Sequence, residues 1–145
     1  MTASEVDAFL ERSRTGVLTT LGRDGFPHSV AMWFVRADHE LLMWTYRKSQ
    51  KARNAIRDPR AAFLLESGDG YNSLAGVMIK GRLRPIESFD EVAAIGRRLY
   101  ERYTFPSTGL PYDQGPNVEV ERQVSKRIGL ALPLGRTTSW DHSKL

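Results

Sequence analysis

The chain has 145 residues, which is the size of one domain, and we expect a single domain over residues 1–145. It contains no cysteine, which excludes disulfides, zinc–thiolate sites, iron–sulfur clusters and thiol catalysis, and its three scattered histidines argue against a histidine-built metal site. The net charge of +4 permits an anionic ligand, nucleic acid or a membrane surface as partner. Neither a membrane-spanning run nor a signal-peptide pattern is found, so we expect a cytoplasmic protein.

The first half of the chain reads as a helix followed by strands. Thr2 and Glu5 resemble a capping box that begins a helix ending near Arg14. β-Forming residues over 15–21 and 26–37 flank a glycine-containing turn, which predicts a hairpin. The elements expected next are a strand over 41–46 and a short helix from Ser49 to Arg57 that ends before Pro59.

The second half continues this alternation. Strands are predicted over 60–67 and 74–85, separated by a turn at 68–73. Ser88 and Glu91 resemble a second capping box for a helix that reaches Tyr103. A Pro/Gly-rich loop is expected over 104–117, residues 118–127 are ambiguous, and a strand over 127–140 has an edge or bulge at Pro133. About six hairpin-connected strands predict a mainly β, antiparallel sheet that closes into a small barrel or curls into a sandwich.

Cations crowd around a predicted helix start. Arg47, Lys48, Lys51 and Arg53 flank Ser49, although a helix N-terminus disfavours added positive charge. One interpretation is a solvent-exposed basic surface, with Ser49 as an ordinary cap. The other is a phosphate site, in which the first N–H groups of the helix and the cations bind the anion. Tryptophans on the neighbouring predicted strands favour a flat ring that carries the phosphate, and nucleic acid would use the same ingredients.

The order of these motifs resembles a known superfamily. "TGVLTTLGRDGFPHSVAMWF", "WTYRKSQKARNAIRDPRAAFLL" and "GVMIKGRLRPI" are similar, across residues 15–85, to the flavin-binding split-barrel superfamily that includes pyridoxamine phosphate oxidases. The ending "TTSWDHSKL" resembles the branch that uses the deazaflavin coenzyme F420 rather than FMN. The resemblance implies a six-stranded antiparallel split β-barrel with flanking helices. It further implies a homodimer with each cofactor in a groove at the subunit interface.

The resemblance also implies site residues. The cofactor phosphate would lie at Arg47, Lys48, Ser49 and Lys51, with Asn54 supporting the site. The remaining cofactor-binding residues implied are Pro27, His28, Ser29 and Val30 along the ring system, and Trp44 and Thr45 where the strand meets the phosphate site. Candidate proton donors are His28, Tyr71 and His142. The tail, with Trp140 expected to dock, would reach a groove of its own subunit or of the partner.

The function implied is an F420H2-dependent reductase that transfers a hydride to a small conjugated molecule. The alternatives are an FMN enzyme of the same fold and a non-catalytic binder of F420, flavin or tetrapyrrole. A nucleic-acid binder is disfavoured because the aromatic residues alternate into strands instead of interleaving with the cations. The absence of a terminal Arg-Leu-x-Pro element argues against vitamin B6 oxidation. The longer anionic tail of F420 would need further cations, for which Lys80, Arg82 and Arg84, with Arg57 and Arg60, are candidates unless they form an ordinary solvent face.

Overall fold

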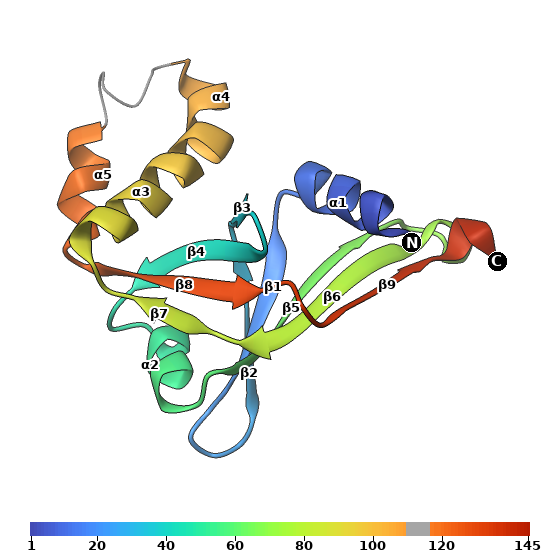
Figure 1. Ribbon diagram of the computed structural model, residues 1–145, viewed down its shortest axis with the longest axis horizontal. Helices are drawn as coiled ribbons and strands as arrows, with labels where there is room; N and C mark the ends of the chain where they lie inside the picture. Colours follow the sequence, from blue (N-terminus) through green and yellow to red (C-terminus); the bar gives the residue numbers. More distant parts are fainter. Residues whose placement is uncertain (110–116) are drawn as a thin grey trace.

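The structure is a computed structural model that describes residues 1–109 and 117–145, and most of this part is built from two antiparallel sheets (Figure 1). In spatial order, the first sheet contains β2 (Pro27–Met32), β1 (Gly16–Leu21), β5 (Arg60–Ser67), β6 (Ala75–Arg82) and β9 (Thr137–Asp141). The second sheet contains β3 (Val35–Ala37), β4 (Glu40–Tyr46), β8 (Arg127–Pro133) and β7 (Arg84–Ile86).

Helices flank the sheets. The α-helices are α1 (Ala3–Arg12), α2 (Gln50–Arg57), α3 (Phe89–Leu99), α4 (Phe105–Thr108) and α5 (Asn117–Val124). The π-helical segment η2 (Tyr100–Thr104) joins α3 to α4, and the 3₁₀ turns are η1 (Tyr71–Ser73) and η3 (His142–Lys144). In Figure 1, α3 and α5 lie on one side of the second sheet and α2 lies on the other. No helix of the described residues is both long and apolar enough to cross a bilayer.

The mainly β architecture and the antiparallel pairing are confirmed, and the two sheets are consistent with a split barrel. The expected count of six is not confirmed: the described residues form nine strands, because three predicted strands each break in two. The breaks fall at residues 33–34, at Leu83 and at residues 134–136, and at each one the chain passes from one sheet to the other. Phe34 and Leu83 remain buried at these crossings, so the hydrophobic pattern continues although the strand does not.

The predicted helix signals had different outcomes. The capping box of α1 is confirmed, since Thr2 Oγ1 accepts the Glu5 N–H and the Thr2 N–H donates to the Glu5 carboxylate. The second capping box is wrong, because Ser88 precedes α3 without a side-chain capping bond. Residues 104–108 are helical rather than a loop, and the ambiguous segment after 117 begins as α5. The rest of the predicted loop, 110–116, lies outside the described residues.

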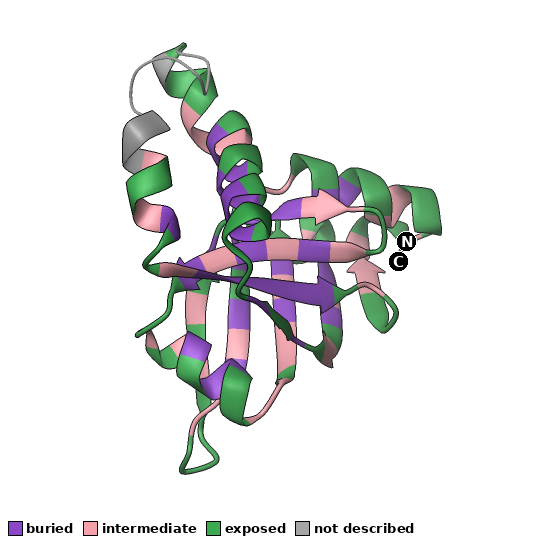
Figure 2. Ribbon diagram, turned by 60° about the vertical axis from the view of Figure 1, so that its left-hand side comes forward, coloured by how far each residue is buried: buried purple, intermediate pink, exposed green. Residues whose placement is uncertain are grey.

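The core has two parts that share strand β8. Between the sheets and under α1, the fully buried side chains include Phe9, Leu18, Phe63, Ile79, Leu130 and Leu132. Under α3 a second cluster includes Val35, Ile86, Val92, Ile95, Leu99 and Ala131. Figure 2 shows β8 buried along most of its length, because its two faces serve these two clusters. The sequence prediction placed its leucines on one buried face, whereas α3 also covers the other.

The C-terminal tail docks on its own subunit, as expected for Trp140. Strand β9 pairs with β6 and places Trp140 opposite Gly76. The indole lies so close to the sheet that a Cβ at Gly76 would fall 2.2 Å from the ring. Glycine at this position therefore leaves room for the tryptophan.

Candidate functional site

The N-terminus of α2 presents backbone donors beside a serine cap. Ser49 is the N-cap, and its hydroxyl accepts the Ala52 N–H at 3.3 Å and lies 3.3 Å from the Thr45 hydroxyl. The N–H groups of Gln50 and Lys51 precede the first intrahelical bond, and the helix dipole favours an anion near them. The predicted helix start and the Ser49 cap are therefore confirmed, and binding of a phosphate there stays a prediction.

The predicted cations around this helix differ in their surroundings. Arg47 is exposed, and its Nη1 lies 3.5 Å from a Glu87 carboxylate oxygen. Lys48 and Arg53 are also exposed, with no carboxylate partner among the described residues. These three side chains resemble the solvent-exposed alternative more closely than Lys51 does.

Of the four cations predicted around Ser49, Lys51 has the least favourable surroundings for a positive charge. It is partly buried, and this burial lowers its pKa below the ordinary 10.5, while neighbouring Arg127 lowers the pKa further. No carboxylate in the described part of the chain pairs with it. A cation that has lost water and faces a second cation is unfavourable unless an anion binds beside it.

Arg127 is a candidate site residue that the sequence analysis did not name. Its guanidinium lies over the rings of Tyr46 and Trp44, at 3.8 and 4.8 Å from their centroids, and donates to Gln123 Oε1 at 2.6 Å. Burial lowers its pKa, and its Nε is buried without a partner in the described residues. Arg127 opposes Tyr46 in the β4–β8 register, so only knowledge of that strand pairing would have revealed it.

The residues predicted along the ring system lie on β2, at the edge of the first sheet. His28 and Val30 are half-buried, whereas Pro27 and Ser29 are exposed, so the strand alternates as a half-covered strand should. The Nδ1 atom of His28 is buried and has no partner in the described part of the chain. This orphaned atom makes His28 the candidate proton donor that the geometry favours.

A cavity joins β2 to the start of α2. It has a volume of about 540 Å³, and its lining includes Pro27, His28, Gln50 and Asn54. Asn54 is fully buried: its amide donates to Thr20 Oγ1 at 3.1 Å and accepts from Gln50 Nε2 at 2.8 Å. Asn54 thus ties α2 to β1 at the cavity wall, and its support of a phosphate site stays a prediction.

A second cavity of about 470 Å³ adjoins Arg127 on the side of α3. Trp33 and Trp44 line it, together with Met32 and Leu99. The Trp44 ring packs against Gly96, where a Cβ would come within 2.6 Å of it. The cavity is therefore apolar and aromatic, with a guanidinium at its border, and could hold a flat organic molecule.

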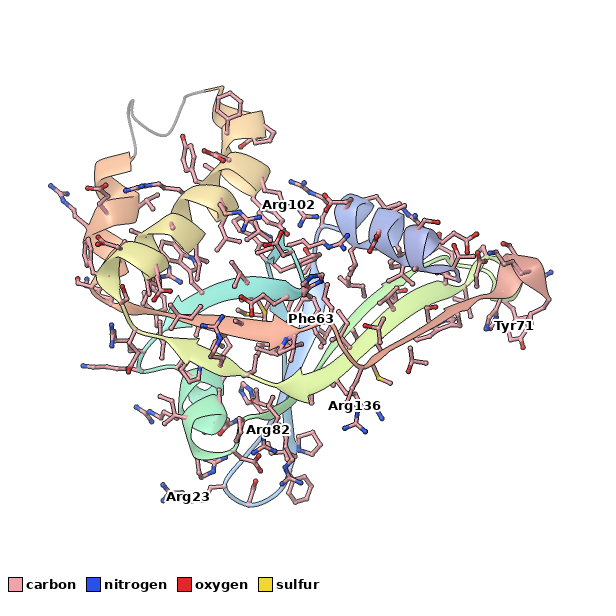
Figure 3. All side chains as sticks on the ribbon, viewed as in Figure 1. Arg23, Phe63, Tyr71, Arg82, Arg102 and Arg136 are labelled. Carbon is pink, nitrogen blue, oxygen red and sulfur yellow. The ribbon has the colours of Figure 1, made fainter. Side chains whose placement is uncertain are left out.

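The other two proton-donor candidates lie together, away from α2. His142 Nδ1 is 2.9 Å from the Tyr71 carbonyl oxygen, and their rings are 4.7 Å apart. Figures 1 and 3 place this pair at the end of the molecule opposite α2. Within one subunit they do not reach the cavity beside His28, and their role as proton donors stays a prediction.

The described residues contain no group of three His, Asp or Glu side chains arranged to hold a metal ion. What the site offers is a helix N-terminus with cations at α2, the cavity beside His28, the aromatic cavity beside Arg127 and an orphaned histidine nitrogen. These features fit a phosphate-bearing ring cofactor that supplies its own chemistry.

Comparison with known proteins agrees with this geometry. The family model described as pyridoxamine 5'-phosphate oxidase matches residues 2–127. No curated protein matches the chain in a sequence search.

Solved structures are similar over nearly the whole chain. The conserved hypothetical protein Rv2991 from Mycobacterium tuberculosis is 42% identical, with a TM-score of 0.88 over 99% of this chain and 87% of that one. A structure described as an F420 reductase is 25% identical, with a TM-score of 0.68 over 91% of this chain and 94% of that one. The FAD and heme binding protein from Mycobacterium smegmatis is 19% identical, with a TM-score of 0.74 over 95% of this chain and 70% of that one, and shows the fold alone.

Proposed function

Because the chain belongs to the pyridoxamine 5'-phosphate oxidase family, we propose that it is an F420H2-dependent reductase that transfers a hydride from the deazaflavin to a small conjugated organic substrate. The family and the fold are those of flavin- and F420-type oxidoreductases. The observation that carries the proposal is the partly buried Lys51 in the first turn of α2, with Arg127 near enough to lower its pKa and no carboxylate pairing with either in the described residues. The Arg47 N–H donates to the Lys126 carbonyl, which holds the start of β8 beside the residues that lead into α2.

The residues present fit a cofactor of this class. Lys51, Arg127 and the first N–H groups of α2 would hold the phosphate, with Arg47 and Lys48 adding positive charge at the rim. Pro27, His28, Ser29 and Val30 would lie along the ring, and Trp44 and Thr45 end the strand that leads to the phosphate. Bound F420H2 would supply the hydride from C5 of its ring.

The residues of the chain itself would position the substrate and keep water away from the reacting atoms. The aromatic cavity beside Arg127 would hold the substrate against the ring and exclude water, and such positioning can lower a barrier by about 7–11 kcal/mol. His28 Nδ1 would be free to hydrogen-bond to the bound ring, because it has no partner in the described part of the chain.

A homodimer is part of this proposal. Strand β2 is a sheet edge, and large apolar side chains are exposed beside it: Phe26 is 74% exposed and Trp33 is 53% exposed. A second copy covering this edge would bury these side chains and complete a groove over β2.

Titration with the two cofactors tests the proposal. Purified protein should quench F420 fluorescence to saturation and respond much less to FMN, and light scattering should give twice the 16.4 kDa of one chain. A yellow protein with a flavin spectrum, or saturable binding of FMN alone, would mean that the cofactor is FMN rather than F420. Binding of neither cofactor would contradict the assignment of the site.

The lowered pKa of Lys51 predicts a pH dependence of this binding. Its folded pKa lies below 10.5, and a bound phosphate favours the charged form. Cofactor affinity should therefore fall as pH rises from neutral through the folded pKa of Lys51, because the protein must then take up a proton on binding. Lys51→Arg, which stays protonated, should bind with a flat profile over this range. Parallel profiles for the two proteins would show that Lys51 does not face the phosphate.

A further inference from the structure

A second group of cations surrounds a hollow beyond the other end of α2. The hollow has a volume of about 550 Å³, and four cations line it, namely Arg60, Lys80, Arg82 and Arg136. The rest of its lining is small or rigid: Ala61, Gly81, Pro133 and Gly135. Figure 3 shows Arg82 and Arg136 on the same side of the molecule, opposite to Arg102.

The fold forces these charges together. Arg60 and Arg82 are directly opposite each other in the β5–β6 register, where like charges are destabilising. The Lys80 N–H donates to the Arg136 carbonyl at 2.9 Å, which fixes the turn between β8 and β9 beside β6. Arg136 therefore joins the group through tertiary structure, and the sequence analysis did not include it.

Neutralisation of the group is incomplete. Asp58 pairs with Arg60 at 2.7 Å, and this hydrogen-bonded partner lowers the Asp58 pKa to about 2. Lys80, Arg82 and Arg136 are exposed, and none of them forms a salt bridge among the described residues, although Arg82 is close enough to lower the Asp58 pKa further. What distinguishes them from the exposed cations around α2 is that they line one hollow. Three positive charges thus face a space that no side chain of the described chain fills.

The other cations predicted for this track are already engaged. Arg84 donates to Glu40 at 2.9 Å, and Arg57 donates to the Leu21 carbonyl and to Asn54 Oδ1. Of the cations predicted for this basic face, Lys80 and Arg82 therefore remain without a salt bridge among the described residues. Arg136 joins these two at the hollow.

We propose that the hollow lined by Arg60, Lys80, Arg82 and Arg136 is a second anion site. It would take a molecule that carries two or more carboxylates. Guanidinium groups bind carboxylates bidentately, and three cations around one space favour a polyvalent anion over a single charge. The carboxylates have two possible sources: a free small polycarboxylate, or the oligoglutamate tail of a cofactor held at α2, and the second source rests on the proposed function. Helix α2, whose eight residues span about 12 Å, separates the two sites and sets the distance that a tail must cross.

Citrate is the probe for the site, measured by calorimetry at low salt. Arg82→Gln combined with Arg136→Gln should weaken citrate binding at least tenfold. The matched control, Arg122→Gln with Lys126→Gln, removes the same charge from exposed positions outside the hollow and should change the affinity less than twofold. Lys51→Met should leave citrate binding in place, which separates this site from the one at α2. Circular dichroism of each variant establishes that it is folded.

F420 with and without glutamates distinguishes the two sources. If the tail occupies the hollow, the longer cofactor should bind wild type more tightly, and the double variant should remove this difference. If the difference persists while citrate binding is lost, the occupant is a free polycarboxylate. Citrate affinity that is unchanged in the double variant would overturn the proposal, and so would saturable binding of duplex DNA in preference to citrate. Failure of F420 to bind at all would remove the proposed function but leave the citrate result standing.

Discussion

Lys51→Met is expected to weaken cofactor binding by about 1.5–3 kcal/mol, or about 10- to 150-fold in Kd, the scale of a charged hydrogen bond. Lys51 combines partial burial, a neighbouring Arg127 and the N-terminus of α2, so a bound phosphate should depend on it more than on the exposed cations nearby. Fluorescence titration with F420, and with FMN in parallel, measures the change.

The same substitution should not lower the free energy of unfolding. Methionine keeps much of the volume of the lysine stem and removes a partly desolvated charge that has no carboxylate partner in the described part of the chain. Lower affinity without lower stability is what a binding residue should show, and urea unfolding provides this second measurement.

Lys126→Met is the matched control, because it removes one charge from an exposed position next to Arg127 in sequence. Its Kd should stay within about twofold of wild type, since exposed charges contribute little. Equal losses in the two variants would mean that net charge, rather than the site at α2, governs cofactor affinity.

Arg102→Ala is expected to lower the free energy of unfolding by about 2–4 kcal/mol, because it removes several charge-assisted hydrogen bonds at once. The Arg102 guanidinium donates to the carbonyls of Phe34 at 3.0 Å, Glu11 at 3.0 Å and Ser13 at 2.6 Å. It also lies over the ring of Phe34, 4.6 Å from the centroid. One side chain thus joins the end of α1, the crossing between β2 and β3, and η2.

Arg98→Ala is the control for this substitution, because within the described part of the chain the only hydrogen bond of its guanidinium goes to the carbonyl of Arg36. It should cost about 0.5–1.5 kcal/mol, as one hydrogen bond does. Urea denaturation measures both, and a change in midpoint at constant m identifies a change in stability. Arg102→Lys separates charge from geometry, since an ammonium group lacks the planar fork. Similar small losses of unfolding free energy for all three variants would show that the Arg102 hydrogen bonds do not hold these segments together.

The predictions that held are those that depend on neighbours in sequence. The Thr2–Glu5 capping box and the Ser49 cap of α2 involve residues within one turn, so local hydrogen bonding decides them. The alternation of buried Val77 and Ile79 with exposed Lys80 follows from the two-residue period of a strand. The start of α2 was predictable for the same reason, because Ser49 and Lys51 lie in one helical turn, whereas anion binding there stays a prediction.

The failures have a common physical cause. Hydrophobic periodicity records which side chains are buried but not which sheet buries them, so the crossings at Phe34 and Leu83 looked like continuous strands. The Ser88–Glu91 pattern gave no capping bond, because residue types at cap spacing do not fix the side-chain conformation.

The sequence by itself determined the local elements, the helix start at Ser49 where the phosphate site is proposed and, through motif order, the family. Only the tertiary structure decided which distant residues come close to each proposed site. The β4–β8 register brings Arg127 to Lys51, the turn before β9 brings Arg136 to Lys80, and the tail carries His142 to Tyr71 instead of to α2. Burial and hydrogen bonding between strands far apart in the chain set these contacts, and no local pattern of residue types encodes them.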